Sequence, residues 1–218
     1  LTSPSLERLY GLTFSPAKGL FLISPFLLLC VPGLIAMWRR GHQQRPLVVA
    51  LALSIAALFA FYASSVMWWG GHTVGPRYLI PILPFMTLPI ILTFAYLFRR
   101  VWGILLTGAL LVISVIMVWV QTIAGQAWPP TDAFLLTIDL MNSSNTFIDY
   151  SLPLLLAGDV ARNYGGILLG LDGLAGLLPL LIALLVTGIG VPYAMLQIIR
   201  SFDGKHRHTK LAATSETP

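Results

Sequence analysis

One short segment of the chain gathers several residue types that could bind an anion. Residues 68–78 read WWGGHTVGPRY, and the arginine at position 77 is the sole formal cation among them. A guanidinium group presents several N–H donors in one plane, which suits a phosphate group. The glycines let the backbone approach a ligand closely and adopt positive φ angles. The spacing therefore predicts a phosphate-binding loop, whose candidate substrate-binding residues are Arg77, His72, Trp68, Trp69 and Tyr78.

A second cation, Lys18, lies in the turn-forming segment GLTFSPAKGLF, which starts at residue 11. Its ammonium group could add to the positive charge that Arg77 offers to a phosphate, so Lys18 is also a candidate substrate-binding residue. Both clusters have a structural alternative. Tryptophan and tyrosine gather at membrane interfaces, and long cationic side chains extend to lipid headgroups. In that alternative, the two cations only anchor the chain to the membrane.

The composition indicates the setting in which these residues work. Of the 218 residues, 57% are hydrophobic and only 10% are charged, whereas soluble domains have roughly 25% charged residues. Together with a mean hydropathy of +0.84, this excludes a water-soluble globule, and a single cysteine excludes a disulfide scaffold. The net charge of +5 does not indicate nucleic-acid binding, because the basic residues follow apolar runs. The sequence predicts an all-α polytopic integral membrane protein.

Five segments are long enough to cross a membrane. Crossing a hydrocarbon core of about 30 Å takes around 20 apolar residues in a helix. Pro81, Pro84 and Pro89 fall in the third segment and should bend it, because proline removes a backbone donor. The predicted spans are about 19–38, 46–67, 79–98 and 101–123, with a fifth between 174 and 199.

The distribution of lysine and arginine predicts how these spans are oriented. Nine basic residues follow spans one, three and five, and the other four lie on the opposite side. Segments rich in basic residues stay on the cytoplasmic side, so we expect the N-terminus outside and the C-terminus inside. The segments that contain Lys18 and Arg77 are then external.

This topology divides the chain into five parts. In the long external loop, apolar residues at helical spacing over 134–141 and 147–155 predict two short helices at the membrane interface. The parts are an external loop at 1–18, four transmembrane helices in two hairpins at 19–123, the external loop at 124–166, the last transmembrane helix at 167–200 and a polar cytoplasmic tail at 201–218.

Familiar motifs for catalysis and metal binding are absent from the sequence. The chain has no GxxxxGK phosphate loop, no HExxH helix and no GxSxG nucleophile turn. Its four histidines fall on both predicted sides of the membrane, so they do not form one metal cluster. We therefore expect no metal and no cofactor, and no catalytic residue is assigned.

Three segments together resemble a group of membrane enzymes. They are GLTFSPAKGLF from residue 11, WWGGHTVGPRYLIPILPF from residue 68, and NYGGILLGLDG from residue 163 with LLPLL from residue 177. The combination is similar to the C-terminal half of bacterial polytopic glycosyltransferases of the GT-C superfamily, which are relatives of the protein mannosyltransferases. The resemblance ends at Leu181 and leaves out the polar tail.

The resemblance implies a transferase of a bacterial inner membrane that takes sugar from a polyprenyl-phosphate donor on the external face. It also implies that the catalytic N-terminal half precedes Leu1. The expected partners are the polyprenyl-phosphate-linked sugar, membrane lipids and that N-terminal part, and nucleic acid is not among them. One alternative stays open, a non-catalytic membrane protein that carries or flips lipid phosphates or packs against other subunits.

Overall fold

The computed structural model describes residues 3–68, 70, 75–124, 145–191, 193–194 and 197. Every regular element among these residues is a helix, which confirms the all-α prediction for this part of the chain. The chain divides into two compact units, Leu1–Ala161 and Arg162–Pro218, and each is described by itself.

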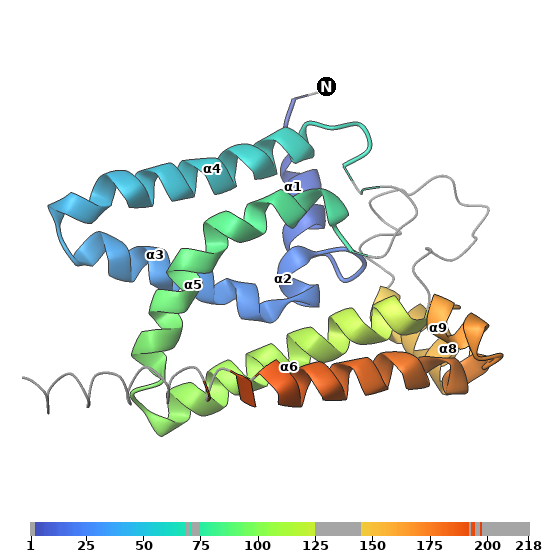
Figure 1. Ribbon diagram of the computed structural model, residues 1–218. Helices are drawn as coiled ribbons and strands as arrows, with labels where there is room; N and C mark the ends of the chain where they lie inside the picture. The colour runs from blue at the N-terminus through green and yellow to red at the C-terminus, as the bar shows by residue number, and fades with distance from the viewer. Residues whose placement is uncertain are drawn as a thin grey trace, which may run out of the picture. The chain divides into compact units, whose positions relative to one another are not determined.

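The first unit holds most of the helices (Figure 1). Its N-terminal half comprises α1 (Leu6–Thr13), α2 (Leu20–Ile23), the 3₁₀ helix η1 (Pro25–Leu29), α3 (Cys30–Arg39), the 3₁₀ turn η2 (His42–Gln44) and α4 (Arg45–Ala63). The 3₁₀ helix η3 (Arg77–Ile82), α5 (Leu83–Leu97), α6 (Val101–Ala124), the π-helical η4 (Thr146–Ser151) and α8 (Leu152–Leu156) follow. The second unit holds α9 (Tyr164–Leu168) and the 3₁₀ helix η5 (Gly173–Leu177).

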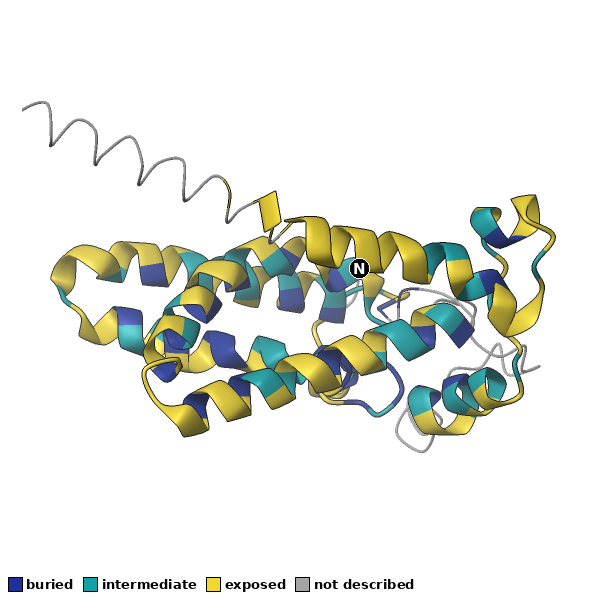
Figure 2. Ribbon diagram, turned by 60° about the horizontal axis from the view of Figure 1, so that its bottom comes forward, coloured by how far each residue is buried: buried dark blue, intermediate teal, exposed yellow. Residues whose placement is uncertain are grey.

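Four helices of the described chain are long and apolar enough to cross a membrane. Most of their side chains lie on the outside of the protein, as the exposed residues in Figure 2 show. Exposed apolar side chains on this scale are costly in water but favourable in lipid. The chain is therefore an integral membrane protein. The four helices are His42–Ala63, Arg77–Leu97, Val101–Ala124 and Gly173–Val191, and they coincide with the second to fifth predicted spans.

The first predicted span, 19–38, differs from a single long helix. It is interrupted at Ser24, whose backbone is not helical (φ −131°, ψ 73°), because the following proline, Pro25, disfavours the helical conformation before it. The continuous helix Pro25–Arg39 has 15 residues and is about 22 Å long, which is short for a hydrocarbon core of about 30 Å. At this break the Phe26 amide finds a partner on another helix, because it donates to Ser114 Oγ of α6 at 3.0 Å.

The pair α3 and α5 crosses at close range (Figure 1). A Cβ added at Gly33 would lie 2.0 Å from the backbone oxygen of Pro89, so only glycine permits this approach. At the same crossing, the Thr93 hydroxyl donates to the Leu29 oxygen at 2.9 Å and to the Pro89 oxygen at 3.2 Å. This crossing fixes α5, and with it η3, against the N-terminal helices.

One face of α6 is buried although most of the helix is exposed. The buried residues recur at one or two helical turns and are small or polar, so the first unit packs against a narrow stripe. The stripe consists of Gly103, Thr107, Ser114, Gln121 and Ala124.

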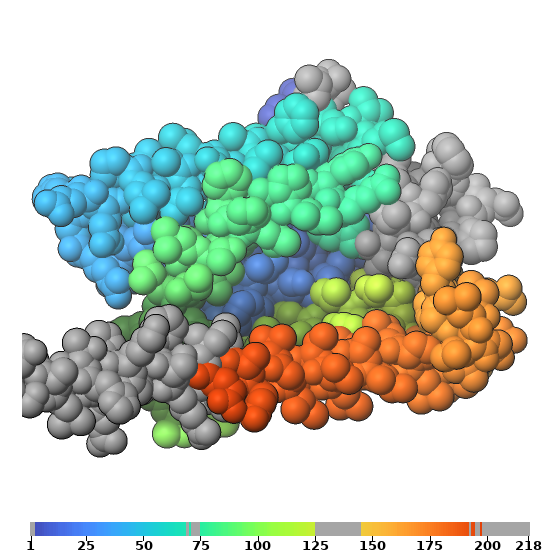
Figure 3. All heavy atoms as spheres, viewed as in Figure 1, coloured from blue at the N-terminus to red at the C-terminus, as the bar shows by residue number. Residues whose placement is uncertain are grey.

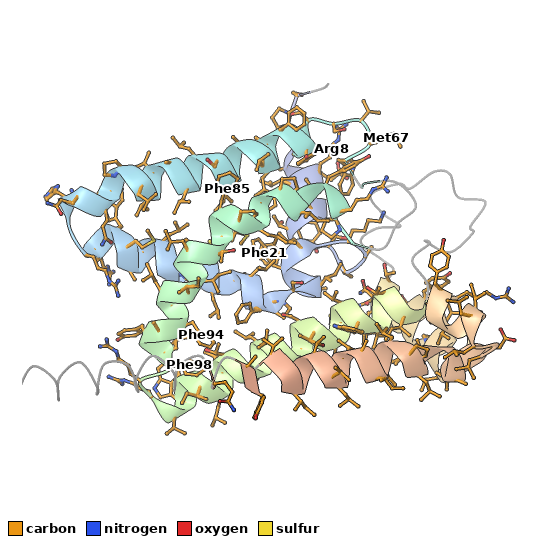
Figure 4. All side chains as sticks on the ribbon, in the orientation of Figure 1. Arg8, Phe21, Met67, Phe85, Phe94 and Phe98 are labelled. Carbon is orange, nitrogen blue, oxygen red and sulfur yellow. The ribbon has the colours of Figure 1, made fainter. Side chains whose placement is uncertain are left out.

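Helix α1 lies against the end of α4. The Ser5 hydroxyl caps α1 by accepting from the Arg8 amide at 3.2 Å. The Arg8 guanidinium donates to the Ala63 oxygen at 3.5 Å, and Figure 4 labels Arg8 at this end of α4. These contacts place the segment after α1, which contains Lys18.

The second predicted interfacial helix, 147–155, is confirmed as a helix over Thr146–Leu156. It begins at Asn145, whose side-chain oxygen accepts from the Phe147 and Ile148 amides. The other predicted short helix, 134–141, lies outside the described residues, as does the polar tail from 201 onwards.

Candidate functional site

A pocket of about 450 Å³ opens in the first unit between α2, η3 and the C-terminal end of α6. In Figure 3 its position corresponds to the hollow where atoms of the N-terminal helices (dark blue) lie between α5 (green) and α6 (yellow-green). Volumes of about 300–1,000 Å³ are typical of pockets for small ligands. The polar residues of its lining are Ser24, Arg77, Gln121 and Thr122, and the apolar ones are Leu20, Ile23, Leu79, Ile80, Leu83 and Val118. Gly75 and Pro76 complete the lining.

Arg77 lies at the rim of this pocket, at the first residue of η3. Two glycines with positive φ shape the backbone around it, Gly70 (φ 79°) and Gly75 (φ 77°). The guanidinium carbon lies 5.3 Å from the centre of the Tyr78 ring, a cation–π contact. Within the described residues its N–H groups make no hydrogen bond or ion pair, so the exposed guanidinium can donate to a ligand.

Lys18 is almost fully buried, with 1% of its surface exposed. Burial, and to a smaller extent the positive charge of Arg77, together lower its pKa from 10.5 to about 8. Its neighbour Ala17 is held by the Thr146 hydroxyl, which donates to the Ala17 oxygen at 2.7 Å. The structure thus brings the two predicted cations into electrostatic contact, although Lys18 is not part of the pocket lining.

Gln121 is a lining residue that the sequence analysis did not single out. It is 4% exposed and belongs to the buried stripe of α6. Within the described part of the chain, its amide makes no hydrogen bond. A polar side chain inside a predicted membrane span is the signal that could have drawn attention to it.

The predicted aromatic residues that the structure describes, Tyr78 and Trp68, pack against other parts of the first unit. Tyr78 stacks on Tyr62 of α4, with ring centres 5.6 Å apart and planes 14° from parallel. Trp68 is buried, and its ring packs so closely on Gly11 that a Cβ there would lie 2.2 Å from it. Neither Trp68 nor Tyr78 lines the pocket. The other two predicted residues, Trp69 and His72, lie outside the described residues.

A larger groove of about 600 Å³ lies between α1, α3 and α4, but its chemistry is different. No cation lines it. Two of its polar groups are already used, since Ser5 caps α1 and the Thr13 hydroxyl donates to the Leu9 oxygen at 2.8 Å. Among the described residues, no three histidine, cysteine, aspartate or glutamate side chains form a group that could hold a metal ion. The pocket beside Arg77 is therefore the better candidate site.

Comparisons of the chain with protein-family models, with curated proteins and with solved structures find no match. The resemblance to GT-C glycosyltransferases stays a prediction. Function is therefore inferred from the pocket and the charged residues beside it.

Proposed function

We propose that this chain is the C-terminal membrane portion of a glycosyltransferase, and that the pocket beside Arg77 binds its donor. The donor is a sugar linked to polyprenyl phosphate, and the acceptor lies on the extracytoplasmic face of a bacterial inner membrane. The observation on which the proposal depends is the exposed guanidinium of Arg77 in the lining of a largely apolar pocket, with the buried Lys18 close enough to feel its charge. The proposal assigns donor binding to these residues and does not assign a general base.

The electrostatics favour an anion at this position. The positive charge of Arg77 acts on the buried Lys18, and a phosphate bound by Arg77 would offset that repulsion. The guanidinium of Arg77 can donate to phosphate oxygens in a bidentate manner. Lys18 is buried, so its charge is less screened than a charge in bulk solvent.

The rest of the lining favours a lipid-linked anion over a water-soluble one. Side chains such as Ile23, Leu79 and Ile80 form the walls beside Arg77, and Ile80 is 61% exposed. An isoprenoid chain can lie on this surface without losing contact with the bilayer, whereas a free sugar phosphate would gain little from it. The combination of one exposed cation and apolar walls therefore matches a polyprenyl phosphate.

We also propose that the chain crosses the membrane five times, with its N-terminus outside and its C-terminus inside. The helix Pro25–Arg39 is joined to α4 by the short turn η2, so the two run as an antiparallel hairpin (Figure 1). Basic side chains at the inner end, such as Arg39 and Arg40, can extend to headgroups and compensate for a short helix. This topology would put the pocket on the external side.

The test is a binding measurement with farnesyl phosphate, a short polyprenyl phosphate, on the purified protein in detergent. Arg77→Ala should weaken binding at least tenfold, because it removes charge-assisted hydrogen bonds. Arg99→Ala is the matched control, since Arg99 is also exposed but lies beyond the opposite end of α5. Unchanged affinity in Arg77→Ala would exclude the site assignment.

A sugar-transfer assay distinguishes a glycosyltransferase from the alternative, a non-catalytic carrier of lipid phosphates. In membranes that contain the complete protein, Arg77→Ala should abolish sugar transfer from a polyprenyl-phosphate donor while the amount of inserted protein stays the same. Wild-type protein that binds farnesyl phosphate but transfers no sugar would instead support the non-catalytic alternative.

A further inference from the structure

Gln121 has no role in the phosphate site described so far, yet it is the most deeply buried polar side chain of that pocket. It is 4% exposed and lies in the wall formed by α6, whereas Arg77 is an exposed residue of the rim. No hydrogen bond within the described residues uses its amide, and neither amide atom is among the fully buried unpaired ones, so the amide is accessible from the pocket. A ligand group that enters the pocket can therefore pair with it.

The packing of α6 holds Gln121 in this wall. Two turns earlier on the same buried stripe, Ser114 accepts from the Phe26 amide at 3.0 Å and donates to the Leu110 oxygen at 2.8 Å. This contact fixes the face of α6 toward the start of η1. Gln121 is therefore directed into the first unit by the same face, beside α2 and η3.

The neighbouring hydroxyl of Thr122 does not compete for the same role. It donates to the Val118 oxygen of its own helix at 2.7 Å. The Gln121 amide differs because it has both donors and an acceptor, and no partner uses them within the described residues. The pocket thus combines a donor-only cation at its rim with a neutral donor–acceptor group in its wall.

These two groups match different parts of one ligand. A phosphate only accepts hydrogen bonds, so it pairs with the guanidinium of Arg77. A sugar hydroxyl both donates and accepts, so it pairs with a carboxamide in both directions. We propose that Gln121 is a specificity residue that hydrogen-bonds a sugar hydroxyl, so that the pocket prefers a sugar-bearing polyprenyl phosphate to the bare polyprenyl phosphate. This inference rests on the proposed function.

The experiment compares two probes, farnesyl phosphate and farnesyl phosphate that carries mannose or glucose on its phosphate. Wild-type protein in detergent should bind at least one of the sugar-bearing probes more tightly than farnesyl phosphate. Gln121→Leu keeps a side chain of similar size but removes the amide, so this preference should fall about five- to tenfold. Its affinity for farnesyl phosphate should stay within twofold of wild type.

Thr107→Val is the matched control. Thr107 lies on the same stripe of α6, and its buried hydroxyl has no partner in the described chain, but it does not line the pocket. Its removal should leave both affinities unchanged. Gln121→Met is a second variant without the amide, and thermal unfolding checks that each variant is folded.

The outcomes separate this inference from the proposed function. If Gln121→Leu and Gln121→Met keep the wild-type preference, or if wild-type protein has no preference, Gln121 is not a specificity residue even though the phosphate site stands. If wild-type protein binds none of the probes, both the phosphate site and the role of Gln121 are excluded. Loss of the preference in the Gln121 variants, with binding of farnesyl phosphate retained, supports the inference.

Discussion

Lys18 holds its proton less tightly than a lysine in water because two effects act on it together. Its side chain is 1% exposed, and Arg77 contributes a second positive charge nearby. The result is a pKa of about 8, so the ammonium group loses its proton within an accessible pH range. An anion beside it would have the opposite effect and raise its pKa.

This titration predicts a pH dependence of phosphate binding. Between pH 7.5 and 9.5 Lys18 loses its positive charge, whereas an arginine guanidinium keeps its proton and a phosphate monoester, with a second pKa of about 6, keeps its charge. The affinity for farnesyl phosphate should therefore fall several-fold as the pH rises. Lys18→Met should bind more weakly at pH 7.5 and show a flat profile. A wild-type profile that is flat as well would contradict the role of Lys18.

The same proton links pH to stability. The pKa of Lys18 is lower in the folded protein than the ordinary value of 10.5, so folding releases its proton between about pH 8 and pH 10.5. Stability from this group therefore rises with pH across that window. Deprotonation of Lys18 therefore does not itself destabilise the fold, so it does not lower binding by unfolding the site.

At the level of helices, the crossing of α3 and α5 determines where η3 and Arg77 lie. Pro89 cannot donate a backbone hydrogen bond, and the Thr93 hydroxyl binds the Pro89 oxygen and the Leu29 oxygen of the facing helix. Gly33 allows the backbones to approach. Lipid provides no hydrophobic force between helices, so close packing and hydrogen bonds of this kind hold the pair together.

Gly33→Ala should therefore destabilise the protein. The new Cβ would meet backbone atoms of Pro89, which cannot rotate away as a side chain can, and we expect a loss of about 1–3 kcal/mol. The midpoint of thermal unfolding in detergent should fall by several degrees. Gly108→Ala is the control, since a Cβ at Gly108 meets nothing within 4 Å and should be neutral or stabilising. Equal midpoints for the two variants would contradict the assigned crossing.

At the scale of the whole chain, the apolar helices and the break at Ser24 decide how many times it crosses the membrane. Four helices are long enough to cross a membrane, and a fifth crossing requires the shorter helix Pro25–Arg39 to cross it as well. If this helix did not cross, residues before and after it would lie on the same side of the membrane. The side of the membrane on which α1 lies, relative to η2, therefore shows whether the chain crosses four or five times.

Single cysteines introduced in a Cys30→Ala background test this topology. Val66→Cys follows α4, Gln43→Cys lies in η2 and Glu7→Cys lies in α1, and all three positions are exposed. In intact cells a membrane-impermeant maleimide should label the cysteines at 66 and 7, and the cysteine at 43 only after permeabilisation. Labelling at 66 without labelling at 7 would exclude the first crossing, and labelling at 43 alone would reverse the orientation.

The sequence by itself determined the class of protein and the positions of four spans. Hydropathy is a property of contiguous residues, so a run such as 101–123 identifies a membrane helix without any knowledge of its neighbours. It also indicated Arg77 and Lys18, because isolated cations stand out in an apolar chain. The interruption at Ser24 was harder to anticipate, because a proline in an apolar run is compatible with either a bend or a break.

Only the tertiary structure decided which side chains form the pocket. Ser24, Arg77 and Gln121 come from three distant parts of the chain, and they line one pocket because the fold brings the ends of α2, η3 and α6 around the same space. Their proximity depends on which face of each helix points inward. In a lipid-facing helix the outward residues are as apolar as the inward ones, so hydropathy cannot identify that face. The same ambiguity left Gln121 unnoticed and made Trp68 look like a ligand-facing residue, whereas its ring packs on Gly11.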